Sequence, residues 1–479
     1  MEEHVVEPAG ARNAASHDSD TPQNLIDFMS RDWIEVRSTA NPHSQAARLR
    51  SRRDELSRSF PGEYLIVPAG EERTRANDTA FRFRPSSDFA YLLGDGEPGE
   101  LLVMEPDGAS HRSILFVSPH NRGRKEFFTD RVHGELWVGR HRGIDESRSY
   151  YGADRVLALD DTFAYLGDLR ASNHPLRLVR GENHAIDAFF PQNAVSDELS
   201  AHLAQMRLVK DDYEIGELRK ACEITKRGFE DVIALFPSAT SEREIEAAFW
   251  RRSRIEGNDV GYLTIAASGV HACTLHWTRN DGAIARNALL LLDAGVERNS
   301  LYTADITRTL PTSGRFTAEQ RAVYDLVWEA QRVAIEAVIP GADFLEPNRR
   351  AMNVLTQGLI DLRILRASLD EALDPENQYY RRYTLHNVSH MLGIDVHDCA
   401  RARAQSYRYG TLCEGMVLTV EPGLYFQPDD ATVPDRFRGI GVRIEDDIAV
   451  TASGHENLSA ILPSQADGVE RWVAEITAG

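Results

Sequence analysis

Short apolar runs separated by turn-forming residues dominate the chain from about residue 46 to 195. The runs are YLIVPAG (64–70), FAYLLG (89–94), ELLVMEP (100–106), SILFVSP (113–119) and RVLALDD (155–161). Runs of this length, bounded by dipeptides such as Asp95-Gly96 and Asp107-Gly108, are typical of buried strands. Because helical stretches alternate with these strands, the pattern predicts an α/β domain with a largely buried sheet.

A long polar–apolar stretch follows, from about residue 196 to 236, and predicts a helical segment whose long helices join this domain to a second one. The second domain has two helix starts of the capping-box type, Ser241 with Glu244 and Thr317 with Gln320. After the second of these, apolar residues recur at helical spacing: Val323, Leu326, Val327, Ala330 and Ala334. We therefore expect domains at 46–195 and 196–479.

Residues 1–45 are rich in Ala, Ser, Asn, Asp and Pro and contain few aromatic residues. This composition cannot bury enough apolar surface to form a core, so it predicts a flexible extension. A short helix is expected within it, around Leu25 to Met29.

Composition and charge exclude several classes of protein. The chain has 479 residues, of which 42% are hydrophobic and 27% charged, as in ordinary soluble globular proteins. The net charge of −20 argues against a nucleic-acid partner, and the longest aliphatic run is too short for a membrane span. The acidic start MEEHVVEPAG and four cysteines without a CxxC pair predict a cytoplasmic protein.

Four segments of the second domain place acidic or imidazole groups inside apolar runs: 289–311, 385–398, 415–426 and 439–450. Charged groups are rarely buried unless they are paired, so these segments are where chemistry is expected.

Asp293 ends a run of four leucines, and Asp305 follows 12 residues later. If Glu297 pairs with Leu301 across a three-residue turn, with Asn299 left-handed, Asp293 lies opposite Asp305 on one face. Two opposed carboxylates repel one another, so a cation should lie between them. Alternatively, each aspartate could simply cap a strand or turn.

Glu421 follows the apolar run MVLTV, where a buried glutamate needs a partner. The alternative is a surface glutamate on an edge strand. Arg443 and Glu445 are two residues apart and therefore share a strand face. Taken alone, that pair would be explained by a surface salt bridge.

His386, His390 and His397 lie within twelve residues, beside a GIDVHD segment that we predict to be a strand. His276, in ACTLHWTRN, is a fourth histidine. A single histidine is more often structural than functional, but three so close together point to a site.

The combination of Asp293, Asp305, His390, Glu421 and Glu445 is oxygen-rich with one imidazole. Such a donor set suits hard or borderline divalent ions such as Mn²⁺ better than a thiolate-rich zinc site would. Four carboxylates balance the charge of two divalent cations. This balance favours a two-metal centre, in which paired ions activate water and polarise a carbonyl.

The motifs DAG…TADITRT, HNVSHMLGIDVHD, TVEPGLY and GVRIEDD resemble, in this order, those of the Xaa-Pro aminopeptidases (aminopeptidase P). These belong to one superfamily with methionine aminopeptidase, prolidase and creatinase. The resemblance covers roughly residues 46 to 470, and FRPSSDFAYLLGDGEPGELLV resembles the aminopeptidase P subfamily. It implies a creatinase/prolidase-like N-terminal α/β domain and a pseudo-symmetric pita-bread catalytic domain with mixed α/β and α+β content.

The resemblance also implies roles for the metal-ligand candidates. Asp293 would chelate one ion, Asp305 and Glu445 would bridge both, and His390 and Glu421 would bind the other. The implied cofactor is two divalent metal ions per chain, with Mn²⁺ as the usual metal.

Other candidates match the family's substrate-binding and proton-handling positions: His276, His386, His397 and Arg443. Glu421 could in addition shuttle a proton from the attacking water. The implied substrates are peptides with proline at the second position, and the implied assembly is a homodimer or homotetramer.

Three departures from the family pattern stand out. The aspartates are 12 residues apart where 11 is common, Asn387 replaces the usual glycine after the first histidine, and Ala90 stands where some relatives have a large aromatic residue. The alternative activity is that of a prolidase, which cleaves only Xaa-Pro dipeptides. A metal-free creatinase-type hydrolase and a binding protein with a dead site are both disfavoured, because all five ligand types are present.

Overall fold

The computed structural model describes residues 21–34, 40–77, 79–190 and 197–478. The chain divides into two compact units, Met1–Leu203 and Ala204–Gly479, which are called the first and second unit below. The division falls within helix α9 (Glu198–Met206). Of the predicted flexible extension, residues 1–20 and 35–39 lie outside the described ranges, and α1 (Gln23–Met29) forms where the short helix was expected.

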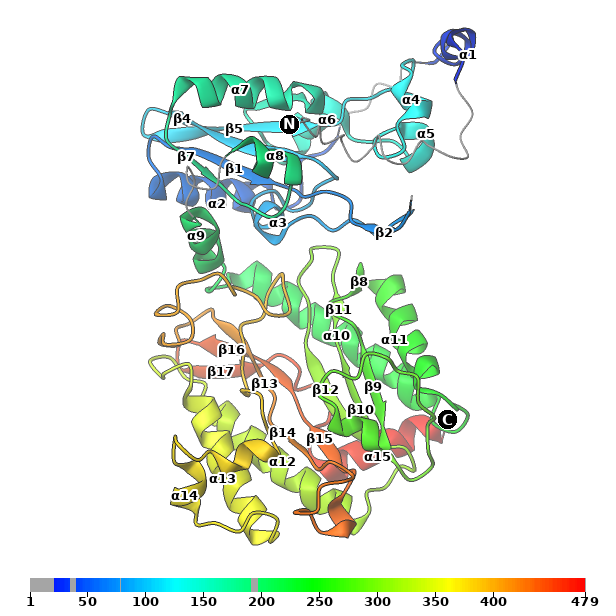
Figure 1. The fold of residues 1–479 in the computed structure, drawn as a ribbon, viewed down its shortest axis with the longest axis vertical. Helices are drawn as coiled ribbons and strands as arrows, with labels where there is room; N and C mark the ends of the chain where they lie inside the picture. The colour runs from blue at the N-terminus through cyan, green and yellow to red at the C-terminus, as the bar shows by residue number, and fades with distance from the viewer. Residues whose placement is uncertain (1–20, 35–39, 78, 191–196, 479) are drawn as a thin grey trace, which may run out of the picture. The chain divides into compact units, whose positions relative to one another are not determined.

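The first unit is built on a five-stranded sheet with the order β6-β5-β4-β1-β7 (Figure 1). Its strands are β1 (Tyr64–Pro68), β4 (Leu101–Asp107), β5 (Ser110–Val117), β6 (Arg155–Ala158) and β7 (Leu176–Leu178). The central pairs are antiparallel, and both edge strands add in parallel. The β4–β5 turn uses the predicted Asp107-Gly108 dipeptide, with Gly108 at φ +65°, where glycine has no steric penalty.

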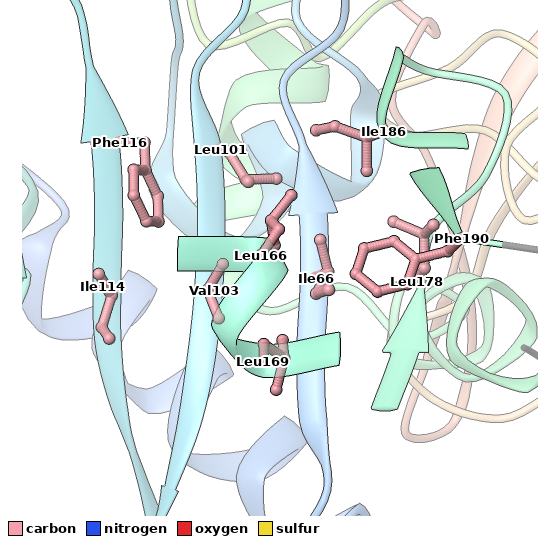
Figure 2. Packing of buried hydrophobic residues seen from close by; sticks show 10 residues of the cluster. All are labelled: Ile66, Leu101, Val103, Ile114, Phe116, Leu166, Leu169, Leu178, Ile186 and Phe190. Carbon is pink, nitrogen blue, oxygen red and sulfur yellow. The ribbon is translucent and has the colours of Figure 1, made fainter. Parts of the chain in front are cut away.

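Helices cover both faces of this sheet. Figure 2 shows Leu166 and Leu169 of α7 (Thr162–Ser172) packed over Ile66 and Val103 of the strands. Full burial of each such side chain contributes about 1.5–3 kcal/mol, so this layer is a main source of the unit's stability. The remaining elements are α2 (Ala46–Ser59), α4 (Glu126–Thr129), α5 (Glu135–Val138), α6 (Gly143–Tyr151), α8 (His184–Phe189) and the hairpin of β2 (Thr74–Ala76) with β3 (Thr79–Ala80).

One predicted strand of the first unit is wrong. Residues 89–94 belong to helix α3 (Ser87–Leu93), which begins where Ser86 Oγ accepts a hydrogen bond from the Phe89 amide. Six of the seven residues of this helix are buried, including the whole run from Phe89 to Leu93, so its apolar residues show no helical period. Ala90, one of the departures from the family pattern, lies inside it and is 4% exposed.

The helical segment predicted between the domains consists of two helices, α9 and α10 (Asp212–Ala234). Asp211 ends the connection by accepting hydrogen bonds from the first turn of α10, and it forms a capping box with Glu214. Just before it, the Lys210 amide donates a hydrogen bond to the Gly415 carbonyl. The intervening backbone is therefore satisfied by tertiary contacts instead of by a continuous helix.

The second unit repeats one arrangement, a helix pair followed by a three-stranded antiparallel sheet (Figure 1). The first half contains α10, α11 (Glu242–Glu256), β9 (Ile265–Ser268), β10 (Leu289–Ala294) and β12 (Ile306–Pro311). The second contains α12 (Ala318–Glu336), α13 (Glu346–Asp361), β13 (Val417–Val420), β16 (Asp446–Thr451) and β17 (Gly454–Asn457). Smaller elements are β8 (Asp259–Val260), β11 (Val296–Glu297), α14 (Leu369–Leu373), β14 (Gly423–Tyr425), β15 (Gly441–Arg443) and α15 (Ala466–Thr477).

Only one of the two predicted capping boxes forms. Thr317 and Gln320 make both reciprocal hydrogen bonds at the start of α12. At α11 the Ser241 side chain makes no cap bond, because the Glu244 carboxylate instead accepts a 2.7 Å hydrogen bond from the Thr240 hydroxyl. No helix in the described ranges combines the length and apolar content that a membrane span would need.

The hairpin that carries the two aspartates differs from the expected register. Asp293 pairs with Thr307, two positions beyond the predicted partner Asp305. The pairing keeps this register to the end of the hairpin, so the connecting loop spans 298–302, and Leu301 takes the left-handed conformation at φ +68°. A shift of two leaves both aspartates on one face, because side chains alternate along a strand. The pairing from Asp293 to the loop therefore contains no bulge.

Candidate metal centre and active site

The predicted metal ligands converge within the second unit. Asp305, His390 and Glu445 each place one possible ligand atom so that these atoms lie within 4.8 Å of one another. The Nε2 atom of His390 is 3.3 Å from Asp305 Oδ2 and 3.5 Å from Glu421 Oε1. Four of the five predicted ligands are thus brought together by their side-chain distances. The fifth, Asp293, lies close enough for its charge to add to the burial and the other carboxylates that raise the pKa of Glu421 and Glu445.

His390 is oriented by its own backbone and by strand β13. Its amide donates to Thr419 Oγ1 at 3.2 Å, and its carbonyl accepts from the Thr419 amide at 2.9 Å. Its Nδ1 lies 3.2 Å from the Met391 carbonyl, a partner that keeps the proton on Nδ1. Nε2 is therefore the ring nitrogen that faces the carboxylates.

The GIDVHD segment, expected to be a strand, is a loop of turns. It is held by Asp398, which is 1% exposed and directly follows His397. The Asp398 carboxylate lies 3.1 Å from Arg207 Nε and 3.3 Å from Lys210 Nζ, and its amide donates to the Met391 carbonyl. The segment is held by a buried ion pair and not by the hydrogen bonds of a sheet. Its pattern of apolar and polar residues therefore did not reveal that it is a loop.

The electrostatics of the cluster indicate an excess of negative charge. Burial, reinforced by the neighbouring carboxylates, raises the pKa of Glu421 to about 7 and that of Glu445 well above its ordinary value. Burial alone would lower the pKa of His390, but the hydrogen bond to Asp305 and the charge of Glu421 raise it to about 9. A divalent cation would relieve this repulsion, so the donor set fits a hard or borderline metal ion.

Asp293 has its own partners. Arg443 Nη2 donates a short hydrogen bond to Asp293 Oδ2, and the Tyr262 hydroxyl donates to Oδ1 at 2.6 Å. Burial raises the pKa of Asp293, while Arg443 opposes that shift. In the structure Arg443 is the cation beside Asp293, whereas Asp305 faces the imidazole of His390.

Arg443 and Glu445 share a face, as their spacing predicts, but they do not form a surface salt bridge. They are 3% and 2% exposed and meet at Thr307 of β12. The Thr307 hydroxyl donates to Glu445 Oε2 at 2.6 Å and accepts from Arg443 Nε at 3.1 Å. This threonine couples the strand after Asp305 to both residues.

His386 lies beside Glu421 and Tyr425. Its Nε2 is 2.8 Å from the Tyr425 hydroxyl, and its Nδ1 is 3.5 Å from Glu421 Oε2. Burial, followed by the charge of Arg443, lowers the pKa of His386 to about 4, so its ring is neutral at pH 7. Asn387 has a negative φ, which any residue adopts, so glycine is not needed at that position.

His397 and His276 are the exposed members of the histidine cluster. The His397 ring meets the His390 ring edge-on, with centroids 4.4 Å apart. Burial, and then the charge of His390, lower the pKa of His397. The charge of His276 adds smaller contributions that lower the pKa of His386 and His397, so all four predicted histidines lie in one region.

Three residues that contact the site were missed from the sequence: Tyr262, Thr307 and Tyr425. Thr307 lies two residues after Asp305 on a strand, so alternation could have placed it on the same face. Tyr425 lies four residues after Glu421 and could have been found by the same rule. Tyr262 precedes β9 in an irregular segment and carries no signal of its own.

Comparison with known proteins gives a consistent result. Two family models match the chain: "Aminopeptidase P, N-terminal domain" over residues 49–177 and "Metallopeptidase family M24" over residues 216–452. A protein named Xaa-Pro aminopeptidase 1 from Streptomyces coelicolor is 48% identical over 459 residues, which cover 94% of this chain and 92% of that protein.

Solved structures agree. Aminopeptidase P from Escherichia coli with the inhibitor Pro-Leu aligns with a TM-score of 0.83 at 31% identity, over 91% of this chain and 100% of that one. A zinc-substituted form of the E. coli enzyme in complex with product aligns with a TM-score of 0.81 at 31% identity, over 91% and 99% of the two chains. The predicted fold class, with an N-terminal α/β domain before a pita-bread domain, is confirmed by these matches.

Proposed function

The chain belongs to metallopeptidase family M24 as an Xaa-Pro aminopeptidase, which hydrolyses the bond between an N-terminal residue and proline, and from this membership we propose a residue-level assignment of its active site. The metal ligands in this proposal are Asp293, Asp305, His390, Glu421 and Glu445. The observation that carries it is the convergence of Asp305, His390 and Glu445, three residues far apart in the chain, with ligand atoms within 4.8 Å.

The proposed cofactor is two divalent ions per chain, with Mn²⁺ as the metal. Four carboxylates balance two divalent charges, and the imidazole of His390 disfavours Mg²⁺, which prefers oxygen ligands. When bound, such ions activate water as a nucleophile and polarise the substrate carbonyl. Asp293 would hold one ion, His390 and Glu421 would hold the other, and Asp305 and Glu445 would contribute to holding both.

The remaining assignments concern protons and substrate. Glu421 takes the proton of the attacking water and delivers it toward the proline nitrogen, which must leave protonated. What distinguishes an Xaa-Pro bond is that it has no N–H of its own, so a peptidase cannot recognise it by a hydrogen bond from that group. His276, His386 and His397 contact the substrate carbonyl region, and Arg443 orients Tyr425, whose hydroxyl accepts from Arg443 Nη1 at 3.0 Å.

The test is to offer Xaa-Pro and Xaa-Pro-Yaa peptides at equal concentration and to follow the products by mass. We expect the tripeptide to lose only its first residue. Xaa-Ala-Yaa is the matched control and should react much more slowly, because it lacks the proline ring. Rapid cleavage of the dipeptide with the tripeptide intact would instead identify a prolidase and leave the metal chemistry standing.

We also propose that the enzyme acts in the cytoplasm as a homodimer or homotetramer. Supporting the assembly, α5 presents three large apolar side chains to solvent: Leu136, Trp137 and Val138, which are 55%, 52% and 49% exposed. Sedimentation at several protein concentrations would measure it, and a monomer at all of them would contradict it. The net charge of −20 supports the absence of a nucleic-acid partner.

A further inference from the structure

Glu242, the first residue of α11, is a fully buried carboxylate that does not belong to the proposed metal-ligand set. It accepts four hydrogen bonds: from the Ser268 amide at 2.7 Å, His271 Nδ1 at 2.8 Å, Trp277 Nε1 at 2.8 Å and the Gly282 amide at 2.7 Å. A carboxylate has about four acceptor positions, so its capacity is fully used. Such a group is costly to bury unless it is satisfied in this way.

All four donors belong to one segment, residues 268–282, which leaves β9 and leads toward β10. Its polar atoms converge on Glu242 from both ends and from its middle. The rings of His271 and Trp277 also stack, with centroids 4.0 Å apart and an interplanar angle of 22°. Residues 268–282 therefore form a closed loop around the carboxylate, which we call the Glu242 loop.

The Glu242 loop is fixed on its other sides as well. The side chain of Asn280, which is fully buried, accepts from the Ala266 amide and donates to the Thr264 carbonyl. A methyl group on Gly282 would come within 2.4 Å of His271 Cε1, so the loop closes too tightly for any larger residue. Little freedom remains for the backbone around His276.

The loop is also tied to the strand that carries Tyr425. Cys273 Sγ donates to the Phe426 carbonyl at 3.2 Å, and Gln427 Nε2 donates to the Cys273 carbonyl at 2.8 Å. His276, three residues later and next to Trp277, is exposed on this anchored region, as are Val270, Thr274, Arg279 and Asp281. A rigid base under an exposed histidine is the arrangement that a preorganised substrate contact requires.

From these contacts we infer that Glu242 is a positioning residue, which holds the 268–282 loop so that His276 faces the substrate. The inference rests on the role proposed above for His276. It adds that the role of His276 depends on Glu242, a carboxylate that touches neither substrate nor metal. Glu242 affects His276 only by holding the 268–282 loop in place.

The test starts with Glu242→Gln, which keeps the size of the side chain but presents an NH₂ group to some of the four donors. We expect kcat/KM for an Xaa-Pro-Yaa peptide to fall by about 10- to 100-fold, as is typical when a supporting group is lost. The division of this loss between kcat and KM should match that of His276→Ala. Metal content should be unchanged. Glu244→Gln, at an exposed glutamate of the same helical turn, is the matched control and should leave kcat/KM as it is.

The decisive measurement is a double-mutant cycle. In a His276→Ala background, adding Glu242→Gln should change kcat/KM by less than about twofold, because the loop then has no histidine to position. The inference would be overturned if the two substitutions lowered kcat/KM independently, so that their fold-changes multiplied in the double variant. Loss of metal from Glu242→Gln, or an inactive Glu244→Gln control, would also overturn it. Wild-type activity of His276→Ala would likewise overturn the inference, because His276 would then have no role to support. The proposed peptidase activity would be unaffected by that result.

Amide hydrogen exchange of peptides from 268–282 gives a readout that is independent of activity. It should rise in Glu242→Gln and stay unchanged in Glu244→Gln, whether or not the substrate assignment is right. Unchanged exchange would contradict the loop-holding role by itself. If Glu242→Gln does not fold, Trp277→Phe removes one donor only and should show a smaller change of the same kind in both exchange and kcat/KM.

Discussion

The hydroxyl of Tyr262 donates a 2.6 Å hydrogen bond to Oδ1 of Asp293, the carboxylate that also receives Arg443. This bond stabilises the ionised carboxylate, which is the form that binds metal. Tyr262 is thus a support for a proposed ligand from an irregular segment 31 residues earlier in the chain.

Tyr262→Phe should therefore weaken metal binding without unfolding the protein. A hydrogen bond to a charged group contributes about 1.5–3 kcal/mol, so the dissociation constant of one ion should rise about tenfold or more. Metal titration by calorimetry on the chelated protein measures this. Tyr409→Phe, at a tyrosine that is 66% exposed, is the control, and equal affinities in both variants would refute the role of Tyr262.

The proposed ligands should differ from the neighbouring histidines in metal retention. Asp305→Ala and Glu445→Ala each remove a proposed bridge, so each should release at least one ion on dialysis. His397→Ala should keep its metal but turn over slowly, because His397 is assigned to the substrate. Elemental analysis decides between the groups, and metal lost from His397→Ala but retained in Asp305→Ala would reverse the assignment.

Removal of the metal by a chelator should abolish hydrolysis. Added Mn²⁺ should restore it better than Mg²⁺, since His390 contributes a nitrogen that Mg²⁺ accepts poorly. The measurement is the rate of Xaa-Pro-Yaa cleavage in samples whose metal content is determined in parallel. Full activity in a sample verified to be metal-free would rule out this reading of the site.

Arg308→Lys should destabilise the second unit. Arg308 is fully buried and uses all five of its N–H groups, on the Asp446 carboxylate and on four backbone carbonyls. Lysine has three donors and cannot reach all five acceptors, so a loss of about 3–5 kcal/mol is expected. Urea unfolding measures it, and Arg332→Lys on the exposed face of α12, with an expected change below about 1 kcal/mol, is the control.

The stability of the first unit should depend on pH through Glu100, which is 3% exposed. Burial, followed by the charge of Glu97, raises the pKa of Glu100 from 4.5 to about 8. Between these values the unfolded chain has released the proton while the folded chain keeps it. The unfolded state then binds fewer protons, so the free energy of unfolding falls as pH rises through this window.

Glu100→Gln should remove that dependence. Compared with the wild type, the variant should gain a few kcal/mol between pH 5 and pH 8, at about 1.4 kcal/mol for each unit of pKa difference. Urea unfolding at both pH values measures the gain. Glu55→Gln, at an exposed position of α2, should show no such pH-dependent gain, and identical pH profiles for wild type and Glu100→Gln would show that the carboxylate ionises freely in the fold.

The errors in the predicted fold have a common physical cause. Residues 89–94 were expected to be a strand because burial on every side removes the period that separates helix from strand. The Asp293–Asp305 hairpin was placed two positions out of register because Leu301, not Asn299, takes the left-handed conformation. In both places tertiary packing overrides the local preference of the residues.

The sequence alone predicted the chemistry of the candidate site. Carboxylates and imidazoles inside runs such as MVLTVE are too costly to bury without a counter-charge, so the sequence predicts Asp305, His390 and Glu421 as members of one candidate site. The tertiary structure decided what surrounds that set. Arg443 reaches Asp293 across 150 residues, and Glu242 holds the loop of His276 from a helix start, contacts that depend on chain packing and leave no period or spacing in the sequence.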